Sequence, residues 1–544
     1  MVSTAACCMA LTSYSGLCVL RGHCGCDLYP GTCTPDGKMD FGYLGLVSID
    51  ASLFYVTSTY LQVLYEVDLN NNMITRIAAG TFATLTSFTG AIDLSVNSIT
   101  MIEVGAMDHL SRINELYLSD NRLSILPPGT LSAMTSLTLL GLDSNGLASI
   151  PSATFARMSA LSILNLGGNR LSVLPSGLFA ALSSLSILSL NQNAFVALPD
   201  LSGCVQLQTL TIWSNAVTSV PSGYFNSVPT LTQLTLSSNR ISVIQSGAFD
   251  ALTRLQSLDL GSNQITVVSS GCFQALTQLT ELDLSNNKLL SPIPLGTFST
   301  LNLLTNLNLD NTSLATLPSG LLGSLPSLTI LSVDDQAYSG ARADVVNRSL
   351  NLNRVVTLPD LFGCTLLQTL SSSSNAITSI PSGYFNALPM LTALDLSSNQ
   401  IAAVQGDAFA ALTNLESLNL QSNVLTLIQD GCFDSSANLA ILRLSQNKLR
   451  TLPRNAFARL TSLTEQVYRL DDEAADRHGL RAAAAASTGT GIAVQPEEGA
   501  NLRNGHDKRA RSAQDDETGN IISEAYGAVV SQETPAIDDA GEDT

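Results

Sequence analysis

The sequence has few of the side chains that most often carry catalysis or bind nucleic acid. Its 544 residues include only four histidines and one tryptophan, and 25 Lys and Arg stand against 44 Asp and Glu. The net charge of −19 argues against a nucleic-acid partner, because proteins that bind nucleic acid present basic patches. A phosphate-binding glycine loop, a kinase motif and a recognisable pairing of nucleophile with histidine are also absent from the sequence. We therefore expect no enzymatic activity, no cofactor and no metal site.

Long apolar runs are absent as well. No segment reaches the roughly 18–20 apolar residues that a bilayer requires, so we predict no membrane span. Residues 1–17 are mildly apolar, but Ser and Thr interrupt them and the first basic residue is Arg21. A secretory signal has a positively charged start followed by an apolar stretch of about 7–15 residues. Residues 1–17 therefore form a possible but weak signal segment.

A repeating unit dominates what is present, and Leu231–Leu252 is one copy of it. Within this copy, Leu234 and Leu236 are spaced as alternate residues of a strand, and Asn239 follows three residues later. The same arrangement recurs 24 residues further on, around Asn263. A period of this length indicates a solenoid, in which each unit buries the apolar side of its strand against its neighbours. The Asn239 amide can both donate and accept, so a stack of such residues would satisfy backbone groups at the turn.

Counting the turn residues gives 17 units. Most of them follow each other at 24 residues, although two steps measure only 22 residues. Thr312 and Gln336 take the place of Asn in two units, and the unit at Asn353 is the most degenerate because Arg348 occupies a core leucine position. The remaining turn residues are Asn72, Asn97, Asn121, Asn145, Asn169, Asn193, Asn215, Asn239, Asn263, Asn287, Asn375, Asn399, Asn423 and Asn447.

The pattern L-x-x-L-x-L-x-x-N-x-L, with a later Phe such as Phe249 and a Leu such as Leu252, resembles the 24-residue "typical" class of leucine-rich repeats. Residues Leu61–Thr75 resemble the first repeat of the variable lymphocyte receptors of jawless vertebrates. This resemblance implies an α/β fold: a right-handed solenoid, or horseshoe, whose parallel β-sheet lines a concave face. It also implies a protein-recognition module of receptor or adhesion type, similar to extracellular leucine-rich-repeat receptors.

Four cysteines precede the repeats with the spacing C-x5-C-x-C-x6-C, namely Cys18, Cys24, Cys26 and Cys33. They resemble the cysteine-rich N-terminal cap of extracellular leucine-rich-repeat proteins, so we predict a cap over residues 18–60 with two disulfides. Such a cap would cover the first strand, whose open edge invites association. The resemblance favours the pairs Cys18–Cys26 and Cys24–Cys33. A zinc site that includes His23 is the alternative, although C-x-C is not a usual zinc-ligand spacing.

A block of about four repeats occurs twice in the sequence. The turn residues from Asn193 to Asn287 each reappear 160 residues later, and Cys204 and Cys272 reappear as Cys364 and Cys432. We expect these four thiols to be buried and free, because turns that lie two or more strand spacings apart exceed disulfide reach. At the junction, residues 337–352 break the period, which predicts a loop, a kink or a local break in the sheet. The sequons at Asn311 and Asn347 are glycosylation candidates if the protein is secreted.

The repeats predict a solenoid over residues 61–470, and the composition then changes. Residues 471–544 are rich in acidic side chains and poor in large apolar ones, so we expect a disordered acidic tail. No cysteine-rich cap follows the last repeat, which departs from the extracellular pattern. The four cysteines before the repeats nevertheless favour a location outside the cell or at its surface, through their resemblance to the extracellular cap. The alternatives are a cytoplasmic scaffold and a receptor ectodomain with a tail whose membrane helix is missing.

The outward strand positions of the expected concave face are polar or acidic and carry few aromatics. We expect a protein ligand with a basic or amide-rich surface to bind there, with Trp213 and Tyr117 as aromatic anchors. The alternative for Trp213 is that its ring packs sideways on neighbouring strand residues. The sequence leaves the oligomeric state open. The candidate ligand-binding residues are Glu115, Tyr117, Asp143, Trp213, Thr235, Asp259, Glu281 and Asp283.

Overall fold

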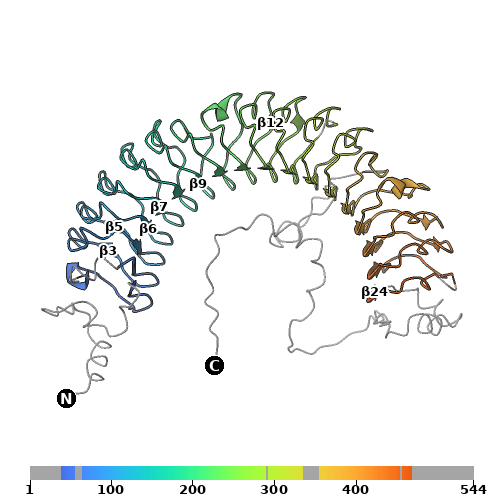
Figure 1. Ribbon diagram of the computed structural model, residues 1–544, viewed down its shortest axis with the longest axis horizontal. Coiled ribbons are helices and arrows are strands. Elements are labelled where there is room, and N and C mark those ends of the chain that lie inside the picture. Colours follow the sequence, from blue (N-terminus) through green and yellow to red (C-terminus); the bar gives the residue numbers. More distant parts are fainter. Residues whose placement is uncertain (1–37, 55–63, 290–291, 335–354, 454–455, 468–544) are drawn as a thin grey trace, which may run out of the picture. The chain divides into compact units, whose positions relative to one another are not determined.

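A computed structural model of the protein describes residues 38–54, 64–289, 292–334, 355–453 and 456–467. All of these residues lie in the compact unit Met1–Val494. They form a solenoid in which each coil contributes one short strand, and these strands follow one another along the same side of the coil (Figure 1). The predicted cap cysteines, the junction 337–352 and the tail 471–544 lie outside the described residues.

The strands on this side join into one 18-stranded parallel sheet among the described residues. Every strand has three residues, and in the first seventeen the central residue is buried while its two neighbours lie on the opposite, outward side. In order, the strands are β1 (Lys38–Asp40), β2 (Glu66–Asp68), β4 (Ala91–Asp93), β6 (Glu115–Tyr117), β7 (Leu139–Gly141), β8 (Ile163–Asn165), β9 (Ile187–Ser189), β10 (Thr209–Thr211), β11 (Gln233–Thr235), β13 (Ser257–Asp259), β15 (Glu281–Asp283), β16 (Asn306–Asn308), β17 (Ile330–Ser332), β18 (Thr369–Ser371), β19 (Ala393–Asp395), β21 (Ser417–Asn419), β23 (Ile441–Arg443) and β24 (Glu465–Val467).

The opposite side of each coil, which we call the turn side, holds almost no helix. Its regular structure consists of short 3-10 helices and two-residue strand pairs, and the rest is turns; no α-helix occurs in the described residues. The α component expected from the sequence is therefore replaced by turns. The elements are η3 (Ala51–Phe54), η4 (Tyr224–Ser227), η5 (Tyr384–Ala387), and the pairs β3 (Arg76–Ile77) with β5 (Met101–Ile102), β12 (Val243–Ile244) with β14 (Val267–Val268), and β20 (Ala403–Val404) with β22 (Leu427–Ile428).

The turn asparagines hold consecutive coils together, as predicted. Asn239 Nδ2 donates to the carbonyl oxygen of Ile212 in the preceding coil (2.9 Å) and to that of Leu236 in its own coil (3.1 Å). Its Oδ1 accepts the backbone N–H of Val217 at 2.9 Å. The side chain is buried, so these bonds satisfy backbone groups that the turn would otherwise leave without partners. Ser238, just before it, has a φ of 53°, a left-handed conformation that recurs at the same place in most coils.

The core is a continuous column of leucines and phenylalanines. The central strand residue Leu234 is 1% exposed, and Phe249 on the turn side is fully buried. Phe249 stacks on Phe225 and Phe273 of the two adjacent coils, with ring centroids 6.0 Å and 6.3 Å away. Each coil therefore buries its apolar residues only against its neighbours, which makes stability a sum of nearest-neighbour contributions.

The sheet does not break where the repeat period fails. β17 pairs directly with β18, with Leu331 opposite Leu370. Asn375 Nδ2 donates to the carbonyl oxygen of Val333 at 2.8 Å, as Asn215 Nδ2 donates to that of Leu190 at 3.0 Å. In the described sheet, no strand therefore lies between β17 and β18, so the unit counted at Asn353 adds no strand to the sheet, and of the loop, kink or break predicted at 337–352 the break in the sheet is wrong. Strand pairing continues from β17 to β18 across this segment of the sequence.

The four repeat cysteines are free and buried, as predicted. Burial raises the pKa of Cys204 to about 12 and that of Cys364 to about 11. A thiol with a raised pKa is a weak nucleophile, because the reactive form is the thiolate. These cysteines therefore contribute packing to the core rather than chemistry.

Candidate functional site

The outward side chains of the 18-stranded sheet form one continuous surface, which we call the sheet face. Strand register aligns them in rows: Thr235 lies beside Asp259 of the next strand, and Asp259 lies beside Asp283. The eight candidate residues all lie on this face, and each is partly exposed. They form two groups, one around β6 and β7 and the other around β10 to β15.

The first group is held by short polar contacts. Tyr117 donates its hydroxyl proton to Glu115 Oε2 at 2.7 Å, and Ser119 donates its hydroxyl proton to Asp143. Burial, together with the neighbouring Glu115 carboxylate, raises the Tyr117 pKa well above its ordinary value. Burial also raises the Asp143 pKa. These side chains therefore present a fixed arrangement rather than a mobile one.

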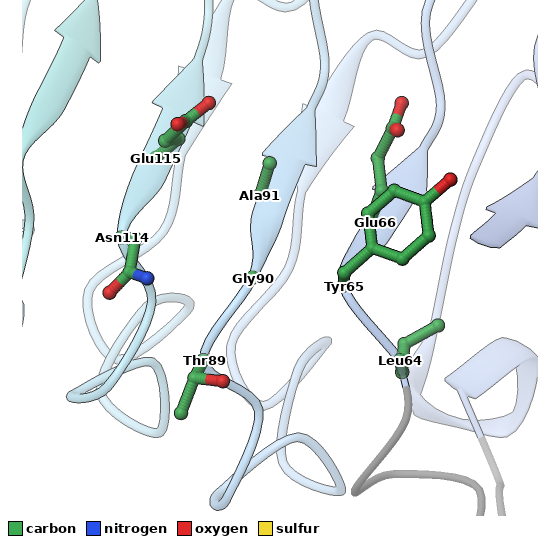
Figure 2. Close-up of a pocket in the computed structure, with 8 residues that line it drawn as sticks. All are labelled: Leu64, Tyr65, Glu66, Thr89, Gly90, Ala91, Asn114 and Glu115. Atoms are coloured by element: carbon green, nitrogen blue, oxygen red, sulfur yellow. The ribbon is translucent and has the colours of Figure 1, made fainter. Parts of the chain in front are cut away.

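A pocket of about 450 Å³ lies beside this group, at the start of strands β2, β4 and β6 (Figure 2). Glu66 and Glu115 extend on either side of Ala91, which is in register with both. The Tyr65 ring forms part of the wall and is 48% exposed. Sequence analysis did not identify this pocket, although the step of 25 residues from Asn72 to Asn97 was visible in the sequence.

In the second group, Trp213 follows β10 and its side chain is partly buried. Its backbone N–H donates to Asn191 Oδ1 at 3.1 Å, which ties the start of this turn to the preceding coil. Thr235 lies beside Thr211 of the preceding strand. The alternation of buried and partly exposed residues from Thr209 to Trp213 therefore places Trp213 on the sheet face.

Carboxylates continue from this group across several coils. Asp283 Oδ1 accepts the backbone N–H of Ser285 (2.7 Å), and Asn308 Nδ2 donates to Asp283 Oδ2 (3.2 Å). Burial, reinforced by the nearby Asp259 carboxylate, raises the Asp283 pKa to about 7. The Asp259 pKa is also raised by burial. Asp283 is therefore only partly ionised near neutral pH.

The next row of the sheet face, two residues further along each coil, contains a carboxylate that sequence analysis did not single out, Asp310. Asp310 Oδ1 accepts the hydroxyl proton of Ser332 (2.5 Å) and the backbone N–H of Asp334 (2.6 Å). Asp334 Oδ2 in turn accepts the hydroxyl proton of Ser371 at 2.6 Å. Burial raises the pKa of both carboxyls, and for Asp334 the neighbouring Asp310 adds to this shift. Asp310 occupies the same outward position as Trp213, so the repeat spacing was the signal that could have found it.

The sheet face also carries apolar side chains that resemble core residues in the sequence. Leu139, Ile163 and Ile187 are the first residues of β7, β8 and β9 and stand in one row. Ile187 is 37% exposed. They were missed because the repeat pattern alone does not distinguish an outward apolar residue from an inward one. Their register, one residue before the buried strand centre, places them outward.

The two glycosylation candidates have different outcomes. Asn311 is only 5% exposed and has a φ of 51° in a turn. Its Nδ2 donates to Asn286 Oδ1 at 3.0 Å. This geometry disfavours a glycan at Asn311, because the amide would have to leave its packed position. Asn347 lies outside the described residues.

The described residues contain no group of three or more His, Cys, Asp or Glu side chains with metal-site geometry. Over the same ranges, no helix is long and apolar enough to span a bilayer.

Comparisons with known proteins agree with this geometry. A family model described as "Leucine rich repeat" matches residues 91–147, 135–195, 205–265, 229–289, 365–425 and 413–465, and a second "Leucine Rich Repeat" model matches residues 278–301. A search of curated proteins found no match.

Solved structures show the same fold. The leucine-rich-repeat protein LIC12759 of Leptospira interrogans is similar with a TM-score of 0.63 and 26% identity, over 79% of this chain and 95% of that one. A Toll structure, solved as the Toll–Spatzle complex from Drosophila, is similar with a TM-score of 0.57 and 20% identity, over 76% of this chain and 54% of that one. The TLR13–ssRNA13 complex gives a TM-score of 0.55 and 24% identity, over 76% of this chain and 56% of that one.

The family models together match more than half of the chain, and they match the coils whose asparagine turns and strand register are described above. The chain therefore belongs to the leucine-rich-repeat proteins.

Proposed function

We propose that this protein recognises a protein partner through its sheet face. The observation that carries this proposal is the in-register surface of outward side chains, which a fully packed core holds rigid. Strand alternation separates the outward residues from the core, so the surface can be complementary to a partner without a cost in folding. A rigid surface also loses little conformational entropy on binding, which favours affinity.

The chemistry of the face favours a partner with basic or amide-rich groups. Acidic side chains occur on several strands of the face, including Glu66, Glu115 and Glu281. Opposite charges on a partner would speed encounter and make binding sensitive to salt. Trp213 and Tyr117 supply aromatic surface, which is the kind that dominates binding energy at protein interfaces.

The same charge argues against a nucleic-acid partner. Phosphate contacts require Lys and Arg, and repulsion between carboxylates and phosphates would oppose binding. The protein as a whole carries a net charge of −19. A protein partner is therefore the better fit to this surface.

A receptor or adhesion role outside the cell is part of this proposal. It rests on the resemblance of Cys18, Cys24, Cys26 and Cys33 to an extracellular disulfide cap, and a cytoplasmic scaffold is the alternative. Intact mass before and after reduction, with alkylation of free thiols, would test it. Two disulfides among these four cysteines support the extracellular role, whereas four alkylated cap thiols in secreted material would contradict it.

The binding proposal can be tested by photo-crosslinking in the native cell. A photoreactive residue would be placed on the sheet face at 235, and in matched controls on the exposed turn side at 205 and 254. We expect a protein adduct from position 235 that is absent from both controls. Adducts that form only from the turn-side positions, or no adduct from any of the three, would overturn the proposal.

A further inference from the structure

The pocket beside Ala91 arises from one extra residue in the chain. In the coils around it, two residues separate the buried residue before the strand from the buried strand centre, as between Ile113 and Leu116. Between Phe88 and Ile92 there are three residues, Thr89, Gly90 and Ala91. Insertions of this kind re-aim side chains and occur often beside functional sites. Here the insertion produces a hollow in the sheet face rather than a regular strand entry.

The residue at position 90 has to be glycine because the backbone of the previous coil approaches it closely. A Cβ at Gly90 would lie 1.8 Å from the Tyr65 carbonyl oxygen. That oxygen accepts the Ala91 backbone N–H at 2.8 Å, and the Gly90 oxygen accepts the Asn114 N–H at 3.2 Å. The floor of the pocket is therefore backbone and one methyl group, held between two hydrogen-bonded coils.

The walls of the pocket carry two carboxylates. Glu66 and Glu115 flank Ala91 on the neighbouring strands, roughly 10 Å apart at two strand spacings. Tyr117 holds Glu115 through the hydrogen bond at 2.7 Å. Lys38 holds Glu66 through an ion pair at 3.1 Å. Both carboxylates are therefore oriented before any ligand arrives (Figure 2).

The charge around the pocket is negative. Asp68 and Asp93 stand in the next row of the same strands, beside Glu66 and Ala91. Lys38 offsets part of this charge through its contacts with Glu66 and with Asp68, at 3.1 Å and 3.0 Å. The surplus of carboxylates favours a cationic ligand, and the partly exposed Tyr65 ring adds a face against which a cation can stack.

We propose that this pocket receives an arginine side chain of the protein partner. The assignment rests on the proposed function of the sheet face and names the group that this part of the face recognises. A guanidinium is planar and carries donors on opposite edges, so it can bridge two oriented carboxylates while stacking on an aromatic ring. An ammonium is a compact and strongly hydrated charge and satisfies fewer of these contacts at once.

The inference can be tested with defined peptides and the full-length protein. The probe is acetyl-Gly-Ser-Gly-Arg-Gly-Ser-Gly-amide, and the matched peptides carry lysine or citrulline in place of arginine. Binding would be followed by saturation-transfer NMR at low salt. Citrulline keeps the shape and loses the charge, so we expect it to bind about tenfold more weakly, and lysine to fall between the two.

Two substitutions remove the pocket's chemistry, and each has a control outside the candidate binding residues. Ala91→Leu fills the pocket, and leucine is tolerated at this strand position because Leu139 occupies it in β7; Ala393→Leu is the control at the same position in β19. Glu115→Gln removes one carboxylate charge, and the control is Glu416→Gln, which changes an exposed glutamate just before β21. We expect each pocket variant to weaken the arginine peptide about fivefold or more, with both controls unchanged.

Deleting Gly90 is a further variant, because it restores the regular spacing of the strand entry. Thermal unfolding would verify that each variant is folded. Equal binding of the arginine and citrulline peptides, or equal binding of arginine and lysine, would overturn the assignment. Unchanged arginine binding in the folded pocket variants would also overturn it. If position 235 crosslinks to a protein partner but the arginine peptide does not bind the pocket, the proposed function stands and the arginine assignment is wrong. If the arginine peptide binds the pocket but position 235 gives no adduct, the pocket is specific for arginine and the proposed function is wrong.

Discussion

The duplicated block and its copy share their turn side and differ on the sheet face. In the first, Tyr224 donates its hydroxyl proton to the Pro199 carbonyl oxygen, and in the second Tyr384 donates to that of Pro359. On the face, by contrast, acidic and aromatic residues are exchanged for different types. The exchanged pairs are Trp213 with Ser373, Thr235 with Asp395, Asp259 with Asn419, Glu281 with Ile441 and Asp283 with Arg443.

This contrast shows which positions the fold constrains. Turn-side residues make contacts that every coil needs, whereas an outward strand residue can change its chemistry without disturbing the core. The copy therefore keeps the scaffold and presents a different surface. We infer that the two blocks contact different parts of a partner, or that only one of them does.

The copy also differs in its core. Ser372 stands where the first block has Ile212, and Ser436 stands where it has Leu276. Both serines are fully buried, and within the described chain neither hydroxyl has a hydrogen-bond partner. A buried polar group without a partner costs free energy, and so does the lost apolar volume. The copy should therefore be the less stable of the two blocks.

The largest expected effect comes from moving this defect into the first block. Ile212→Ser should lower the free energy of unfolding of the first block by about 4 kcal/mol, because it removes a buried side chain and adds an unsatisfied hydroxyl. Pulsed thiol labelling in increasing urea would report on each block, since Cys204 lies in the first and Cys364 in the second. In the wild type, labelling of Cys364 before Cys204 is expected; simultaneous labelling would contradict the difference in stability.

The reverse change should stabilise the copy by a smaller amount. Ser372→Ile and Ser436→Leu each restore an apolar residue and remove an unpaired hydroxyl, which should add about 2 kcal/mol apiece to the stability of the copy. The gain is smaller than the loss above because the copy has packed around serine and resists a larger side chain. The measurement is the urea midpoint of Cys364 labelling, with Cys204 as the internal control. A lower midpoint would mean that the serines fit their sites.

A third test compares the two blocks in binding. Trp213→Ala should weaken binding of the photo-crosslinked partner by about 2 kcal/mol, because an anchor tryptophan buries a large apolar surface. Ser373→Ala removes the matching side chain of the copy and should leave affinity unchanged. Titration of both variants, with thermal unfolding as a check on folding, would decide it. Equal affinity in the two variants would place the binding site away from Trp213.

The smallest expected effect is a pH dependence specific to the first block. Because the folded-state pKa of Asp283 is raised to about 7, its contribution to stability is complete below the unfolded pKa near 4 and is lost as pH rises through 7. The free energy of unfolding should therefore fall between pH 5 and 8 by about 1 kcal/mol less in Asp283→Asn than in the wild type. The difference is small because partial solvent access screens the charge.

Asp200→Asn is the control for this change. Hydrogen bonds from the Ser202 hydroxyl and backbone N–H, and then from the Gly177 N–H, lower the Asp200 pKa to about 2, so Asp200 stays ionised across this pH range. Urea unfolding at pH 5, 6, 7 and 8 would make the comparison. A wild-type stability that does not fall with pH would show that Asp283 is ionised throughout.

Sequence reasoning identified the repeats, the asparagine turns, the free thiols and the face that carries Trp213. It did not identify the pocket at Gly90 or the carboxylate at Asp310, although both leave traces in the residue spacing. The pocket depends on the approach of the Tyr65 carbonyl from another coil, and the Asp310 contacts come from Ser332 and Asp334. Aligning the repeats with one another shows which positions correspond, but it does not predict which atoms of neighbouring coils come into contact.

The sequence by itself determined the coil, because the spacing of Leu234, Leu236 and Asn239 encodes strand alternation and a turn that closes on its neighbour. It also determined that the polar strand residues such as Thr235 point outward, since that follows from the same alternation, but it did not identify the outward apolar residues Leu139, Ile163 and Ile187. Only the tertiary structure decided that β17 pairs directly with β18, and that Asn311 is buried rather than displayed. The reason is physical: periodicity fixes the local path of the chain, whereas strand pairing and burial are settled by contacts between residues far apart in sequence.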